Sequence, residues 1–145
     1  MIGPHGERCD EVISDKKIVF SGPGTSTVYL LNPRQCNVEK IKVDGCAIIT
    51  GKRCDWMARA NVNSPEEIFI ELKRAGRLQR AAHQLEATIT SLSVDVNKLR
   101  KRCLVVYTSI SLASTVAQKY KDQFKRKYNA RLLTVRHCTE VPLDG

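Results

Sequence analysis

Two acidic residues and one lysine are the side chains best placed to do chemistry. Asp55 lies in Arg-Cys-Asp-Trp-Met at 53–57, and Glu71 and Lys73 lie in Ile-Glu-Leu-Lys at 70–73. Side chains two residues apart on a strand point to the same face, so Glu71 and Lys73 should project together. Charged groups on an otherwise apolar strand are costly to bury unless they are paired or bind a ligand. If the strand of Asp55 lies beside this one, two carboxylates and a lysine converge, and such hard oxygen ligands suit Mg²⁺.

The spacing of these residues resembles the active site of the PD-(D/E)XK nuclease superfamily, which includes many restriction enzymes. In that superfamily an Asp on one core strand is followed on the next strand by Glu-x-Lys, and here 15 residues separate Asp55 from Glu71. Gln84 comes 11 residues after Lys73, where the following helix of the superfamily often carries a Gln. Two departures stand out: no Pro precedes Asp55, and the core helix before the first strand would have to come from 7–14 or 34–40.

The resemblance implies a role for each residue of this set. Asp55 and Glu71 would bind Mg²⁺ or Mn²⁺ together with the main-chain carbonyl of Leu72. Such a metal lowers the pKa of its bound water and neutralises charge on a phosphoryl oxygen. Lys73 would deprotonate or orient the attacking water, either as a base or as an ammonium clamp, and Gln84 would complete the catalytic set. The implied activity is metal-dependent hydrolysis of phosphodiester bonds in DNA.

Other interpretations of the same residues stay open. Glu71 and Lys73 could form a salt bridge on an exposed edge strand, with Asp55 a surface charge near a turn. Asp44 directly precedes a glycine, which favours a turn or strand-end role over a third carboxylate. The alternative functions are a catalytically inactive nucleic-acid-binding or scaffold domain of the same fold, and a protein-interaction module.

The charge of the chain is concentrated in its second half. The net charge is +9, yet residues 1–72 carry nine Lys/Arg and ten Asp/Glu, whereas residues 73–145 carry 15 and five. A concentrated basic surface is expected of a protein that binds a phosphate backbone. The expected partner is therefore a nucleic acid, which the resemblance implies to be DNA. A homodimer or larger complex is left open.

The predicted helix after Lys73 places two arginines beside the site. Arg77, Arg80 and Gln84 share one face by their spacing. The two arginines are predicted to contact nucleic acid, with an ordinary solvated helix face as the alternative. His83 points off that face, which predicts an ordinary surface histidine.

Hydrophobic periodicity predicts the elements that must position these residues. Helices are expected at 7–14, 75–92 and 112–129, and strands at 16–20, 27–31, 41–50, 53–60, 67–73, 103–110 and 131–138. From residue 41 the order is three strands, helix, strand, helix, strand. This order predicts an α/β or α+β fold, a mixed central sheet flanked by helices, with extra β structure at the N-terminus.

Length and composition limit the class of protein. With 145 residues, 42% of them hydrophobic and 27% charged, the chain should form one domain over 1–145. No apolar stretch is long enough to span a membrane and no signal peptide is recognisable, so a cytoplasmic protein is expected. Six irregularly spaced cysteines favour reduced thiols, and the absence of a C-x-x-C pair argues against structural zinc.

Overall fold

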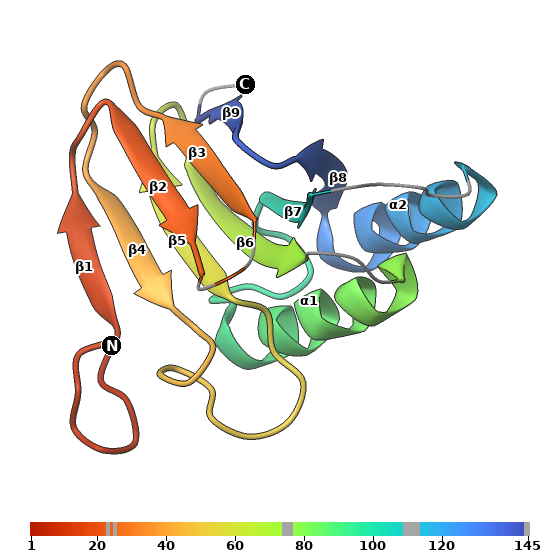
Figure 1. The fold of residues 1–145 in the computed structure, drawn as a ribbon, viewed down its shortest axis with the longest axis horizontal. Helices are drawn as coiled ribbons and strands as arrows, with labels where there is room; N and C mark the ends of the chain where they lie inside the picture. The colour runs from red at the N-terminus through yellow and green to blue at the C-terminus, as the bar shows by residue number, and fades with distance from the viewer. Residues whose placement is uncertain (23, 25, 74–76, 109–113, 144–145) are drawn as a thin grey trace.

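The structure is a computed structural model that describes residues 1–22, 24, 26–73, 77–108 and 114–143. Within these residues the chain forms a three-layered molecule of two sheets and one layer of helices (Figure 1). The elements in chain order are β1 (Asp10–Ile13), β2 (Lys17–Ser21), β3 (Thr27–Leu31), β4 (Val38–Lys42), β5 (Trp56–Asn61), β6 (Pro65–Lys73), α1 (Leu78–Leu92), β7 (Lys101–Tyr107), α2 (Ser114–Tyr128), β8 (Ala130–Arg136) and β9 (Thr139–Pro142).

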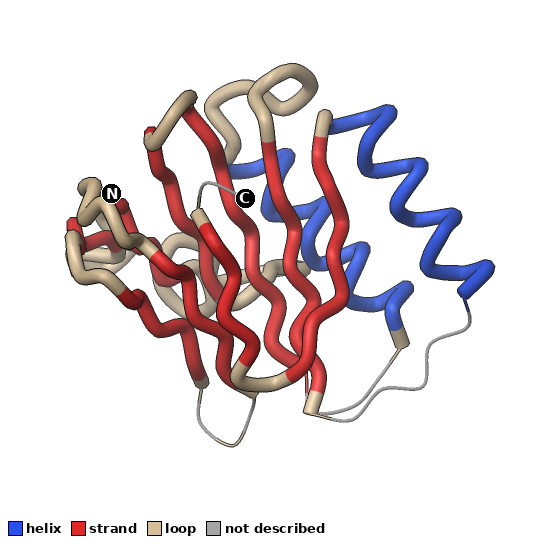
Figure 2. Tube along the Cα trace, turned by 90° about the horizontal axis from the view of Figure 1, so that it is seen from above, coloured by secondary structure: helices blue, strands red, loops and turns tan. Residues whose placement is uncertain are grey.

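The larger sheet has six strands in the order β1-β4-β5-β6-β7-β8. Its pairs are antiparallel as far as β6, and β6, β7 and β8 are parallel to one another. Parallel neighbours need a crossover, which α1 and α2 provide. Such crossovers are right-handed, and the two crossovers here both step in the same direction across the sheet, from β6 to β7 and from β7 to β8. Both helices therefore lie on the same face of the sheet. Figure 2 shows the two helices together on one side.

A smaller sheet, in the order β2-β3-β9, covers the opposite face. The central strands are therefore buried on both sides, which explains their nearly continuous apolar sequences. On β6, Phe69 packs toward the helices, whereas Ile68 and Ile70 pack toward the small sheet. A mixed α+β fold is confirmed. The helices cover one face of the large sheet, and the small sheet covers the other.

The predicted order of three strands, helix, strand, helix and strand is confirmed from β4 to β8, with differences at several ends. The strand expected at 41–50 ends at Lys42 and continues as a turn, in which Gly45 has a φ of 77°. The helix expected at 7–14 is wrong, since Asp10–Ile13 pairs with β4 as a strand. No helix forms at 34–40 either, so neither segment supplies the helix that the resemblance requires before the first core strand. The starts of the two long predicted helices, at 75–76 and 112–113, and the strand end at 109–110 lie outside the described residues.

The expectation that all six cysteines are reduced is also wrong. Cys9 and Cys46 form a disulfide between the residue before β1 and the turn that follows β4. They lie 37 residues apart in the sequence, and the pairing of β1 with β4 brings them together. Among the described residues, no helix is long and apolar enough to cross a membrane.

Candidate active site

Asp55 is held at the start of β5 by the end of β6. Its N–H donates to the carbonyl of Ile70 (3.1 Å), so it continues the antiparallel ladder one residue before the strand begins. The Leu72 N–H donates to Asp55 Oδ2 (2.7 Å). The N–H and C=O of one strand residue point toward the same neighbouring strand, so the Leu72 carbonyl oxygen also faces the Asp55 side.

Glu71 and Lys73 lie side by side at the end of β6, on the face covered by the helices. The Lys73 ammonium is 3.0 Å from Glu71 Oε2, and the Lys73 and Glu71 side chains are only 15% and 4% exposed. The salt bridge that the alternative interpretation expected therefore forms, but its expected position on an exposed edge strand is wrong, because β6 is an interior strand with neighbours on both sides. The other carboxylate oxygen, Glu71 Oε1, is buried and has no hydrogen-bond partner among the described residues.

Helix α1 brings Gln84 into this cluster. The Lys73 ammonium donates to Gln84 Oε1 (2.8 Å), so the lysine is held between a carboxylate and an amide. One turn further along, the Thr88 hydroxyl donates to the Gln84 carbonyl (2.9 Å) and accepts the Cys54 N–H (2.8 Å). This hydroxyl therefore ties α1 directly to the segment that carries Asp55.

The two carboxyl groups have raised pKa values. Burial and then the charge of Asp55 raise the pKa of Glu71 to about 8, although Lys73 partly opposes this shift. Burial raises the pKa of Asp55 as well, while hydrogen bonds from Leu72 and with Glu71 work against that rise. Without a further cation, the pair therefore keeps a proton at neutral pH. When both carboxyl groups are ionised, one ammonium does not balance their two negative charges, so a further cation would be attracted to this site.

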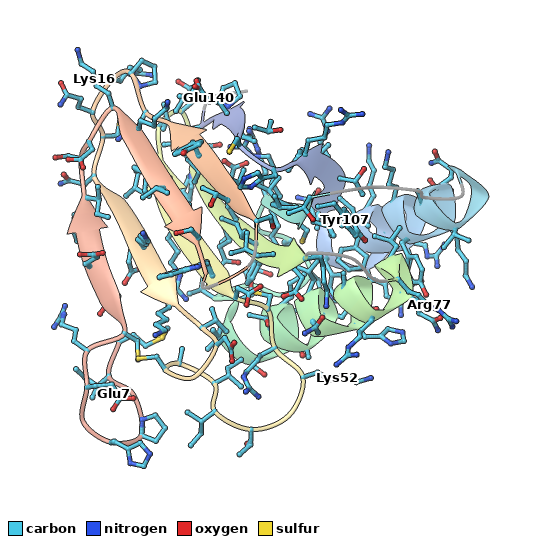
Figure 3. The ribbon with its side chains drawn as sticks, viewed as in Figure 1. Glu7, Lys16, Lys52, Arg77, Tyr107 and Glu140 are labelled. Atoms are coloured by element: carbon cyan, nitrogen blue, oxygen red, sulfur yellow. A yellow bond between two sulfur atoms is a disulfide. The ribbon has the colours of Figure 1, made fainter. Side chains whose placement is uncertain are left out.

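A cleft of about 590 Å³ opens beside the carboxyl pair. Basic and polar side chains from the turn before β5 and from the start of α1 surround Asp55 and Gln84 there: Lys52, Arg53, Arg77, Gln79, Arg80 and His83. Figure 3 shows Lys52 and Arg77 on the same side of the molecule. The structure thus places the two predicted arginines in one cleft with Asp55 and Gln84.

Several residues at the cleft were missed by the sequence analysis. His83 is half-buried and lines the cleft together with Arg80 and Gln84, although it was expected to point off their face. Asp44 lies in a turn, as expected, but it also lines the cleft, where Arg53 Nε donates to its Oδ1 (2.7 Å). The pairing of Arg53 with Asp44 depends on the contact between the turn after β4 and the segment before β5, which the sequence does not show.

Tyr107 is a further polar group that the sequence did not reveal. It pairs in register with Lys73 across the parallel strands β6 and β7, and its side chain is 1% exposed. Its hydroxyl has no hydrogen-bond partner among the described residues. Burial and then the charge of Glu71 raise the pKa of this hydroxyl. In the sequence, Tyr107 belongs to an apolar run that predicts packing alone.

The donor set fits a divalent cation that prefers oxygen. Asp55, Glu71 and the Leu72 carbonyl offer only oxygen atoms, and Glu71 Oε1 is a buried acceptor without a donor. A buried polar atom without a partner is rare in folded proteins and often marks a bound ion or water. Oxygen ligands with positions left for water are typical of Mg²⁺ sites.

A second groove, of about 700 Å³, lies between α2 and the starts of β7 and β8. Exposed cations line it on both sides, among them Lys121, Lys125 and Arg131. Lys101 also lines it, but its ammonium donates to the carbonyls of Asp95, Leu99 and Tyr128, and it is therefore a structural group. The groove and the cleft lie at opposite ends of β7.

Comparisons of the chain with models of protein families, with curated proteins and with solved structures find no match.

Proposed function

We propose that this protein is a Mg²⁺-dependent nuclease that hydrolyses phosphodiester bonds in DNA. The observation that carries the proposal is the convergence of Asp55, Glu71 and Lys73 at one end of the sheet, beside a cleft lined with cations. The order of elements over 38–136 is the one that the resemblance to PD-(D/E)XK nucleases requires, apart from the missing helix before the first core strand.

In this proposal Asp55, Glu71 and the Leu72 carbonyl hold the cation, which lowers the pKa of a bound water and offsets charge on the phosphate. The chain itself orients the reactants. Gln84 and Glu71 hold the Lys73 ammonium in place, so it can position the attacking water or stabilise the charge that develops on the phosphoryl oxygens. Arg77 and Arg80 on α1 bind the phosphates on either side of the scissile bond.

A cleavage assay with the full chain tests the proposal. Supercoiled plasmid, single-stranded DNA and RNA are incubated with Mg²⁺, Mn²⁺, Ca²⁺ or EDTA. DNA cleavage is expected with Mg²⁺ and Mn²⁺, and binding without cleavage with Ca²⁺, because two carboxylates and a carbonyl form a site for oxygen-seeking cations. Cleavage that persists in EDTA would contradict the proposal.

Two matched variants separate the site from the rest of the molecule. Glu71→Gln removes the charge of a predicted metal ligand at nearly constant volume and is expected to abolish cleavage. Glu140→Gln makes the same change on β9, at an exposed residue that pairs with Lys17 far from the cleft (Figure 3), and should leave cleavage unchanged. Folding of both is checked by thermal melts. A folded wild-type chain that binds DNA but cleaves no substrate would instead support the non-catalytic nucleic-acid-binding domain.

A further inference from the structure

A second cluster of metal-ligating side chains lies near the N-terminus. A carboxylate oxygen of Glu7 and the sulfur atoms of Cys9 and Cys46 all lie within 4.8 Å of one another. Both cysteines are buried and Glu7 is half-buried. Figure 3 shows Glu7 on the loop before β1, at the opposite side of the molecule from Arg77 at the cleft.

The loop that carries Glu7 is built around this cluster. The Gly3 N–H donates to the Glu7 carbonyl (2.7 Å) and the Gly6 N–H donates to the Gly3 carbonyl (3.0 Å), which closes a tight turn. The His5 N–H donates to Glu7 Oε2 (3.0 Å). A Cβ at position 3 would clash with Glu7 Oε1 and would lie 3.0 Å from Cys9 Sγ, so Gly3 leaves room for the carboxylate in its present position beside the sulfur.

The carboxylate of Glu7 lies without a cationic partner among the described residues. In the described part of the chain no ion pair includes Glu7, and the neighbouring Arg8 pairs with Asp10 instead (3.4 Å). Opening the disulfide would add two sulfur ligands beside this unpaired carboxylate. Two thiolates and one carboxylate form a donor set that favours Zn²⁺ over the oxygen-seeking Mg²⁺.

We propose that the reduced chain binds one Zn²⁺ through the sulfur atoms of Cys9 and Cys46 and a carboxylate oxygen of Glu7. A dithiol reductant supplies two electrons and two protons, so the S–S bond becomes two thiols while the reductant is oxidised to its own disulfide. Zn²⁺ binding then releases the two thiol protons to solvent. The fourth position is left to water or to the imidazole of His5 on the same turn. The oxidised chain has no thiolates at this site, so oxidation releases the metal.

Metal binding to the full chain, with the disulfide intact or reduced by a phosphine under argon, tests this proposal. Zn²⁺ affinity is measured by competition with a chromophoric chelator, and Co²⁺ serves as a spectroscopic probe. The reduced chain is expected to bind one Zn²⁺ and to show thiolate-to-cobalt charge-transfer bands. The oxidised chain is expected to show no such bands. Equal metal binding by the oxidised and reduced chains would overturn the proposal.

Variants assign the ligands. Cys46→Ser should lose the charge-transfer bands, and Glu7→Gln, which keeps both cysteines, should bind Zn²⁺ at least tenfold more weakly. The double variant Cys36→Ser/Cys138→Ser removes the two thiols that are not buried and should behave like the wild type. Glu71→Gln removes a predicted metal ligand at the cleft and should keep the bands, which would show that they do not come from an ion bound in the cleft. Charge-transfer bands that persist in Cys46→Ser would show that the metal is bound elsewhere. An unchanged Zn²⁺ affinity in Glu7→Gln would show the same, and this second measurement tests the proposal even if Cys46→Ser does not fold.

Discussion

Lys73 is held in one position by two acceptors, Glu71 Oε2 and Gln84 Oε1, at 3.0 and 2.8 Å. An ammonium fixed in this way is ready to handle a water or a phosphoryl oxygen, and groups of this kind contribute about 10²–10⁴-fold to rates. Lys73→Met should therefore lower single-turnover cleavage by at least about 100-fold.

The same variant should keep its affinity for Mg²⁺, since no ligand is removed. Gln84→Ala loosens the lysine without removing it and should cause a smaller loss of rate. The measurements are single-turnover cleavage and a calorimetric Mg²⁺ titration, with Lys16→Met at the far side of the molecule as the control (Figure 3). If folded Lys73→Met cleaves at the wild-type rate, the lysine has no catalytic role.

Glu71 makes stability depend on pH in a definite direction. Its pKa is about 8 in the folded chain, against an ordinary value of 4.5, so between these values the folded state holds a proton that the unfolded state has lost. The contribution of Glu71 to the free energy of unfolding should therefore be largest below about pH 4.5, fall as the pH rises toward 8, and level off above that. The raised pKa of Asp55 acts in the same direction.

Urea unfolding in EDTA between pH 5 and 9 measures this dependence. Glu71→Gln should flatten it, whereas Glu140→Gln should follow the wild type. Asp10 does not interfere, because hydrogen bonds with Glu39 and the N-terminal ammonium lower its pKa to about 2, below this range. Mg²⁺ at 100 times its dissociation constant should stabilise the wild type by about 2.7 kcal/mol and leave Glu71→Gln unchanged. Wild-type stability that rises between pH 5 and 8 would contradict the assignment.

At the scale of elements, the docking of α1 decides where Asp55 lies. The Thr88 hydroxyl is fully buried and joins the Cys54 N–H to the helix. Thr88→Val leaves that buried N–H without an acceptor, which costs about 1–3 kcal/mol of stability. Because the next residue is Asp55, cleavage should fall as well.

Thr90→Val is the matched control on the same helix. Thr90 is exposed and its hydroxyl donates only to the helix carbonyls of Glu86 and Ala87, so its loss should change stability by no more than about 0.5 kcal/mol. Chemical denaturation and cleavage rates of both variants check the prediction. Equal effects of the two substitutions would mean that the bond to Cys54 does not position the site.

Local periodicity explains why much of this architecture was predictable. The apolar run of β7 and the three- and four-residue spacing of α1 are properties of neighbouring residues, and the sequence predicted both, together with the i, i+2 relation of Glu71 and Lys73. Strand β1 was not predictable because its four residues become a strand only by pairing with β4. Cys9 and Cys46 meet for the same reason, and no local signal marks them as partners.

The residues of the candidate site also fall into a predictable group and one that was not predictable. Asp55, Glu71, Lys73 and Gln84 follow from spacing and from a resemblance that concerns spacing. Tyr107 comes to lie opposite Lys73 only through the register of β6 and β7, which the sequence does not specify. Proximity that depends on strand register or on long-range pairing was thus the part that sequence reasoning could not supply.

At the scale of the whole molecule, cations line two separate depressions, the cleft and the groove, which lie toward opposite ends of β7. Tyr107, at one end of the strand, lies beside Lys73 at the cleft, and Lys101, at the other end, lines the groove under α2. Six residue steps of about 3.3 Å separate them, or about 20 Å. This distance corresponds to about six nucleotides of a strand at 3.4 Å each, so only a longer nucleic acid can reach both places.

DNA affinity should therefore fall steeply with salt, and the two places should differ in their effect. Arg77→Glu at the cleft should weaken binding to all sequences alike, reduce the slope of log affinity against log salt by about one, and slow cleavage of every substrate. Lys121→Glu/Lys125→Glu in the groove should weaken binding of 20-nucleotide DNA but leave cleavage of a short oligonucleotide unchanged, because no charge at the cleft is altered. Lys16→Glu makes the same charge change on the opposite side of the molecule and should do neither (Figure 3). Fluorescence anisotropy over a range of salt concentrations measures all three variants. If Lys16→Glu weakens binding as much as Arg77→Glu, the attraction reflects net charge alone, and the cleft is not where the backbone binds.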